Sequence, residues 1–337
     1  MNRFTLSAGL ALMLVFSAIS LTTRGWGVWG HQHINHAAVF ALPMPMRGFY
    51  FDHIDYLTME ASVPDIRKYT PPDPAEGPRH FIDLEDYSSK GIADIPKDYT
   101  AALQRYGSAM LQKDGSLPWY VMYMENQLTD AFKEKDPAKI LYLSADLAHY
   151  IGDAYMPLHT TTNYDGQLTG QRGVHALWES MIPELFGSKY DFHTPAARYL
   201  ADPQAEIWNV IQASHDSITR LLATEKQLLE VLPASEVYEH AADGSIRRNR
   251  YGEGIFSASF AARWNHALGG MVESQMRKAI TEVASFWYTA WVDGGKPDLD
   301  SLDPSYLKQA EQANYRQQYR AWTQGRLIGI PTRSEFN

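Results

Sequence analysis

Apolar residues recur every three to four positions along most of this chain, the spacing of an α-helix that buries one face. No run alternates apolar and polar residues at every second position, as a half-buried strand does. The sequence therefore predicts an all-α fold, a single domain of many helices arranged like a bundle. The helical pattern covers residues 26–42, 97–113, 118–133, 173–186, 203–231 and 257–292.

One further predicted helix has well-marked ends. It begins at Asp136-Pro137, where an aspartate can cap the first turn and proline fits the first helical position. It ends near Met156-Pro157, because proline cannot continue a helix. The Thr-, Gly- and Asn-rich residues 160–171 that follow predict a loop.

The two ends of the chain differ from its helical middle. Residues 1–25 resemble an export signal: Arg3 precedes an apolar run, and Ala18-Ile19-Ser20 is a small-x-small cleavage site. An uncleaved membrane anchor is the alternative; no later run approaches the roughly 20 apolar residues of a membrane span. We expect a periplasmic or extracellular protein without a membrane span after cleavage. Residues 26–295 would form the domain, and residues 296–337 a polar C-terminal appendage.

The net charge and the cysteine content restrict which partners and which metal ligands the chain can have. The net charge of -9 argues against a binder of long polynucleotides, since an acidic protein gains little from counterion release. It does not argue against a small phosphate ester held by a metal. The chain has 0 cysteines, which excludes disulfides and thiolate ligands, so His, Asp and Glu must hold any metal.

The segment His149-Tyr-Ile-Gly-Asp153-Ala-Tyr-Met-Pro-Leu-His159 carries the strongest chemical signal. His149 and Asp153 lie one helical turn apart and so share a face. His175 and Glu179 repeat that spacing on the next predicted helix. A single pair of this kind is usually exposed or caps a helix, so the repeat matters. Two helices that each present a histidine and a carboxylate can build a multinuclear site, and these ligands suit zinc.

This segment resembles the ligand core of bacterial zinc-dependent phospholipases C and zinc-dependent single-strand-specific nucleases. Trp26-Gly-Val-Trp-Gly-His31 is similar to the mature N-terminus of that superfamily. Asp65, in Val-Pro-Asp-Ile-Arg, and His80, in Arg-His-Phe-Ile-Asp, match its next two ligands. The resemblance extends from residue 26 to about residue 182, and the C-terminal half adds helices without a motif.

The resemblance implies a cluster of three zinc ions between the helices of a phosphoesterase domain. The third ion would need the free α-amine of Trp26, and so cleavage after Gly25 instead of after Ser20. The implied ligands are Asp65, His80, His149 and Asp153 for one ion; His159, His175 and Glu179 for another; and Trp26, His31 and Asp153 for the third.

The resemblance also implies hydrolysis of a phosphodiester by a zinc-activated hydroxide in line with the leaving group. Asp65 is the candidate to accept a proton from the nucleophile. Glu179 and the short interval between His159 and His175 favour a phospholipase C-like enzyme acting on a phospholipid or similar small ester. The alternatives are a nuclease or nucleotidase, with nucleic acid as substrate only, and a non-catalytic zinc-binding surface protein.

The candidate substrate-binding residues carry weaker signals than the candidate metal ligands. Phe81 and Asp83 match a base-binding pair in the nucleases, although a packing phenylalanine and a capping aspartate would fit equally. Arg79 and Arg172 are candidates to contact a substrate phosphate, with surface ion pairs as the alternative.

Overall fold

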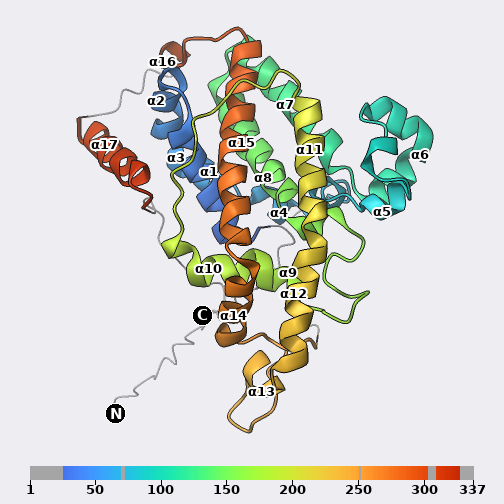
Figure 1. The fold of residues 1–337 in the computed structure, drawn as a ribbon. Coiled ribbons are helices and arrows are strands. Elements are labelled where there is room, and N and C mark those ends of the chain that lie inside the picture. Colours follow the sequence, from blue (N-terminus) through green and yellow to red (C-terminus); the bar gives the residue numbers. More distant parts are fainter. Residues whose placement is uncertain (1–25, 70–72, 250–251, 303–308, 327–337) are drawn as a thin grey trace, which may run out of the picture.

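The computed structural model describes residues 26–69, 73–249, 252–302 and 309–326 (Figure 1). Within these ranges the chain folds into helices and forms no β-strand, which confirms the all-α prediction. Isolated antiparallel bridges occur only between residues 238 and 256 of the described part. The expected signal peptide over residues 1–25 lies outside the described residues.

Four long helices form the centre of the domain (Figure 1). The central helix α8 packs against each of the other three. Trp287, fully buried, donates its indole N–H to the Ser144 carbonyl at 2.9 Å and so joins α15 to α8. These helices are α1 (Val28–Ala41), α7 (Leu117–Glu134), α8 (Pro137–Ala154) and α15 (Met271–Asp293).

The predicted ends of α8 are confirmed. The Asp136 side chain accepts a hydrogen bond from the Lys139 backbone N–H at 3.1 Å, and Pro137 occupies the first turn. The helix stops at Ala154, and a short 3-10 helix, η3 (Pro157–Thr160), follows at once. This turn brings the chain after Pro157 back beside the end of α8.

Shorter helices connect the long ones and carry several site residues. α6 is kinked at Gly107, whose φ is +78°. The π-helical turn η4 interrupts the helix predicted over residues 173–186. These elements are α2 (Met44–Asp52), α3 (Ile54–Glu60), α4 (Val63–Arg67), η1 (Gly77–His80), α5 (Leu84–Tyr87), η2 (Ile92–Asp94), α6 (Tyr99–Asp114), α9 (Val174–Ala176), η4 (Leu177–Met181), α10 (Ile182–Phe186) and η5 (Gly187–Lys189).

Two long helices predicted from periodicity are each divided. The segment 203–231 forms α11 (Pro203–Asp216) and α12 (Ile218–Val231), followed by the short α13 (Ala234–Val237). The single helix expected over residues 257–292 is wrong: α14 (Ala258–Leu268) ends before Gly269-Gly270, and α15 starts after it. Both glycines have positive φ, +63° and +79°, a conformation that ends a right-handed helix.

The described parts of the C-terminal segment, residues 296–302 and 309–326, pack against the domain. It contains α16 (Leu299–Leu302) and α17 (Gln309–Thr323). Trp322 in α17 is only 4% exposed and stacks on Phe40 of α1 at 6.2 Å. The Arg47 guanidinium of α2 lies 4.5 Å from the Tyr319 ring. Aromatic packing therefore holds this polar segment in place.

The helices of the described part are each too short or too polar to cross a membrane.

Gly115 fixes the junction between α6 and α7 beside the candidate site. Its φ is +88° and ψ 157°, and a Cβ there would lie 2.2 Å from the Phe81 carbonyl oxygen. We expect Gly115→Ala to lower the free energy of unfolding by roughly 2–5 kcal/mol, through backbone strain and overpacking.

Gly107→Ala is the matched control for this substitution. Gly107 has nearly the same backbone angles, φ +78° and ψ 159°, but a Cβ there meets nothing within 4 Å. This substitution should lower the free energy of unfolding by roughly 1–3 kcal/mol, through backbone strain alone. Denaturant unfolding of both variants measures the difference, and equal losses would contradict the role of the contact with Phe81.

Candidate metal centre

The side chains predicted to bind metal meet in one buried region. They come from helices and turns that are far apart in sequence and converge on the C-terminal part of α8. None is more than 7% exposed. They are His31 on α1, Asp65 on α4, His80 on η1, His149 and Asp153 on α8, His159 on η3, His175 on α9 and Glu179 on η4.

Asp153 lies at the centre of this region. Its Oδ2 is 2.9 Å from His80 Nδ1 and 3.3 Å from His149 Nε2. Its Oδ1 is 3.5 Å from His31 Nε2 and 3.4 Å from His159 Nδ1. One carboxylate thus faces different histidines with each oxygen, the arrangement that a ligand shared between metal ions requires.

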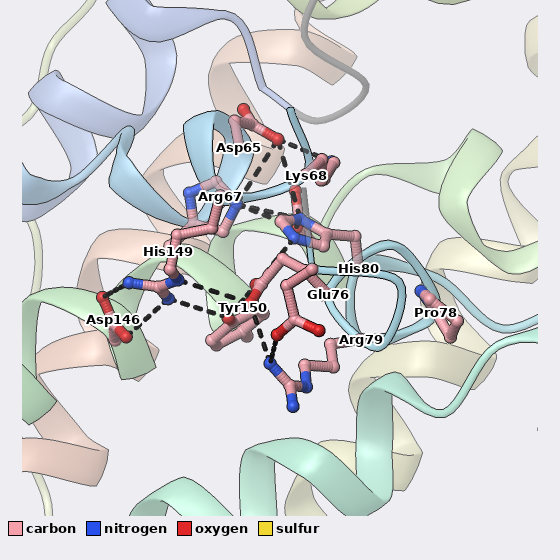
Figure 2. A network of polar contacts seen from close by, with 12 residues as sticks. Asp65, Arg67, Lys68, Glu76, Pro78, Arg79, His80, Asp146, His149 and Tyr150 are labelled. Atoms are coloured by element: carbon pink, nitrogen blue, oxygen red, sulfur yellow. Dashed lines mark hydrogen bonds and ion pairs between the residues drawn. The ribbon is translucent and has the colours of Figure 1, made fainter. Parts of the chain in front are cut away.

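Asp65 completes a first ligand group with His80, His149 and Asp153. Its Oδ1 lies 3.7 Å from His80 Nδ1 and 3.9 Å from His149 Nε2, and Figure 2 shows these side chains pointing toward one another. The Lys68 ammonium is 2.6 Å from the same oxygen. Burial raises the pKa of Asp65, but Lys68 and the surrounding histidines outweigh it and lower that pKa overall.

His159, His175 and Glu179 form a second ligand group. Glu179 Oε2 is 2.9 Å from His175 Nε2 and 3.9 Å from His159 Nε2. The π-helical turn η4 carries Glu179, and such turns are frequent at functional sites. Burial raises the pKa of Glu179 to about 7 although His175 lowers it, so a nearby positive charge would strongly favour its ionised form.

Backbone carbonyls orient two of the histidine rings. The Nδ1–H of His149 donates to the Ala61 carbonyl at 2.7 Å, and that of His175 donates to the Tyr164 carbonyl at 2.8 Å. Each bond leaves Nε2 facing the neighbouring ligands. A hydrogen bond of this kind commonly fixes the tautomer of a metal-binding histidine.

The hydrogen bonding of these groups fits bound metal ions. Buried polar atoms in proteins are almost always hydrogen-bonded. Burial lowers the pKa of His31 to about 4, so its ring is neutral and able to bind a metal at pH 7. Within the described part of the chain, no hydrogen-bond partner of good geometry is found for His31 Nδ1, Asp65 Oδ2 or His159 Nδ1.

Three trios of these residues each have ligand atoms within 4.8 Å of one another, and two of the trios share His149. The buried histidine and carboxylate clusters can therefore hold metal ions. The trios are His31, His149 and Asp153; Asp65, His80 and His149; and His159, His175 and Glu179.

Trp26 lies beside the ligands at the start of the described chain. It is fully buried, and its indole N–H donates to the Gly152 carbonyl at 2.7 Å. A Cβ on Gly152 would meet both His31 Nδ1 at 3.2 Å and the Trp26 ring at 3.5 Å. The next backbone N–H, of Gly27, donates to the Glu179 carbonyl at 3.3 Å. The backbone of Trp26 is thus close to the cluster, whereas the cleavage that would free its amine concerns residues outside the described part.

A pocket of about 500 Å³ opens onto the ligands. His80, His159 and His175 form part of its wall, and Phe81 and Asp83, the candidate substrate contacts, also line it. Other residues of its wall include Lys68, Tyr69, Lys113 and Tyr164.

The structure places the two predicted phosphate-binding arginines elsewhere. Arg79 pairs with Glu76 at 2.8 Å and lies over the Tyr120 ring, and Arg172 is 61% exposed and 4.0 Å from Glu253. Neither lines the pocket. Lys68 and Lys113, which the sequence analysis missed, supply its positive charge. The position of Lys68 one turn after Asp65 was the available signal, because residues three apart on a helix are neighbours.

The Asp83 carboxyl in this pocket titrates near neutrality. Burial, and to a smaller extent the negative charges of Asp86, Glu85 and Asp114, together raise its pKa to about 7 although Lys113 lowers it. Its protonation therefore changes within the physiological pH range.

Comparison with known proteins adds no assignment to this geometry. No protein-family model matches the chain, and no curated protein matches it at a significant level.

Proposed function

We propose that this protein is an exported zinc-dependent hydrolase of phosphoric esters. The observation that carries the proposal is the position of Asp153, whose two oxygens face two sets of histidines beside an open pocket. Such a carboxylate suits a multinuclear metal centre that is accessible to substrate. Metal pairs of this type recur in enzymes that displace groups at phosphorus.

Zinc is the metal that the donor set favours. The ligands are imidazoles and carboxylates without thiolates, and the second ligand group offers only His159, His175 and Glu179. Three protein ligands leave a position open for water or substrate, as in catalytic zinc sites. Bound zinc would lower the pKa of a water molecule and neutralise charge on the phosphoryl oxygens.

The residues of this chain would supply orientation and charge. Lys68 lines the pocket 2.6 Å from Asp65, so it holds that carboxylate in place and puts a positive charge beside an incoming phosphate. Asp65 is the proposed acceptor of the nucleophile's proton, since its Oδ2 has no hydrogen-bond partner among the described residues.

The preferred substrate in this proposal is a phospholipid head group or a similar small phosphodiester. A nuclease or nucleotidase activity is the second candidate, and the pairing of Phe81 with Asp83 in the pocket wall favours it. An aromatic ring can stack on an unpaired base, and a carboxyl can bond to the edge of that base.

Hydrolysis by the zinc-loaded protein, measured side by side on phosphatidylcholine vesicles, single-stranded DNA and RNA, tests the proposal. We expect release of phosphocholine or of nucleotides. The preferred substrate then shows whether the enzyme is phospholipase C-like or a nuclease. Tight zinc binding without hydrolysis of any phosphoric ester would instead support a non-catalytic zinc-binding protein.

Asp83→Asn should remove a pH dependence of substrate binding. The ionised carboxylate accepts stronger hydrogen bonds than the protonated form, so KM for the preferred substrate should fall as pH rises through about 7. We expect a change of roughly tenfold between about pH 6 and 8, the size of one charge-assisted hydrogen bond. KM of the Asp83→Asn variant should change little with pH over this range.

Glu225→Gln provides the control for the Asp83 variant. Glu225 is a buried carboxyl whose pKa burial also raises to about 7, but it does not line the pocket. Its variant should keep the wild-type KM profile. A wild-type profile in Asp83→Asn as well would remove Asp83 from substrate binding.

A further inference from the structure

The two ring nitrogens of His80 face different surroundings. Nδ1 points into the first ligand group, 2.9 Å from Asp153 Oδ2 and 3.0 Å from His149 Nε2. Nε2 lies 3.2 Å from Glu76 Oε1. Figure 2 shows the Glu76 side chain beside His80. The Glu76 carboxylate is fully buried. Because of this contact, it can accept the Nε2–H and direct Nδ1 toward the first ligand group.

Glu76 is itself held by groups from several parts of the chain. Arg79 Nη1 lies 2.8 Å from Glu76 Oε2, and Arg67 Nε lies 3.3 Å from the same oxygen. The Tyr150 hydroxyl donates to Oε1. Both carboxylate oxygens are therefore engaged, and the two arginines compensate the buried charge. The carboxylate has little freedom to turn away from His80.

Arg67 connects this carboxylate to α8. Its guanidinium forms a two-pronged pair with Asp146, with N–O distances of 2.6 and 3.2 Å, and donates to the Tyr150 hydroxyl at 3.2 Å. Asp146 and Tyr150 lie on α8 on either side of His149 in sequence, and Arg67 follows Asp65 on α4. The network thus joins the three segments that supply the first ligand group.

We propose that Glu76 is a positioning residue that orients His80 and thereby sets the metal affinity of the first ligand group. Arg67, Asp146 and Tyr150 hold Glu76 in register with α4 and α8. This inference rests on the proposed metal centre. The buried carboxylate acts on one ligand group, through His80, and not on the second group, because within the described part of the chain its side-chain hydrogen bonds are with His80, Arg67, Arg79 and Tyr150.

Glu76→Gln in the full-length protein tests the inference by zinc binding. The amide keeps the volume but loses the charge, and loss of such a carboxylate partner commonly weakens metal binding roughly 10–100-fold. Competition with a chromophoric zinc chelator should show this weakening for one ion while the ion of the second ligand group keeps its affinity. Wild-type affinity for every ion would overturn the proposal.

Glu282→Gln is the matched control. Glu282 is also a buried carboxylate beside an arginine, 3.5 Å from Arg198, but it lies away from the ligands on α15. Its variant should bind zinc as wild type does. Tyr150→Phe removes one hydrogen bond to Glu76. It should lower the affinity for the same zinc ion, by less than Glu76→Gln does. If Glu76→Gln lowers the affinity for every zinc ion equally and also lowers the melting temperature of the metal-free protein, Glu76 has only a structural role.

The His80 ring gives a readout that does not need metal. In the metal-free wild type, ¹⁵N NMR of the histidine side chains should show His80 protonated at Nε2, and in Glu76→Gln this preference should weaken. An unchanged tautomer would contradict the proposal. If the wild type binds zinc but hydrolyses no ester, the proposed function fails while the role of Glu76 stands. If it binds no zinc, the metal centre fails, and with it the inference.

Discussion

Replacing Asp153 with alanine is expected to abolish hydrolysis, lowering kcat/KM by about 10³-fold or more, equivalent to about 4 kcal/mol of transition-state stabilisation. The reason is its central position: it is the one ligand that lies within 3.5 Å of histidines on both of its oxygens among the described residues. Its loss should disturb more than one metal ion. Kinetics and metal analysis of the purified variant measure both effects.

Two comparisons make this result specific. Far-UV circular dichroism should show that Asp153→Ala keeps most of its helix, because the apolar core of α1, α7, α8 and α15 is unchanged. Glu225→Gln, which alters a fully buried carboxylate away from the ligands, should keep both metal and activity. His149→Ala should also abolish hydrolysis, but with less metal lost than in Asp153→Ala. Near wild-type activity in Asp153→Ala would remove it from the bridging position.

Removal of metal should eliminate activity and lower the melting temperature together. A ligand that binds only the native state stabilises it by about 2.7 kcal/mol at a concentration 100-fold above its Kd, and several ions add such contributions. A loss of this size corresponds to a fall in Tm of at least about 5 °C for a domain of a few hundred residues. Without metal, the buried carboxylates of Asp65 and Asp153 would also have less compensation for their charge.

Differential scanning calorimetry with and without a chelator measures this loss. Zinc-replete wild-type protein should contain two to three zinc ions per chain by elemental analysis. Adding zinc back after chelation should restore both Tm and hydrolysis, whereas magnesium, which prefers octahedral oxygen ligands, should not. A Tm and an activity that do not respond to the chelator, or less than one zinc per chain, would exclude the proposed centre.

The sequence by itself determined the helical class and the candidate metal ligands. Helical periodicity and the Asp136-Pro137 start are local properties, since they depend on residues within one or two turns. The spacing of His149 and Asp153 placed both on one face of α8 for the same reason. The motif resemblance then named the more distant ligands, and the structure brings all of these side chains together. Periodicity failed at Gly269-Gly270, where two residues with positive φ interrupt an otherwise continuous apolar pattern.

Only the tertiary structure decided which charged residues face the pocket and which support the ligands. Arg79 looked like a phosphate contact, but the fold turns it toward Glu76, and Lys68 lines the pocket instead. Likewise, the apolar positions of α17 did not reveal that Trp322 would pack on Phe40. The physical reason is the same in each case. Periodicity tells which face of a helix is buried, whereas ion pairs and packing partners depend on segments that are distant in sequence and meet only in the folded chain.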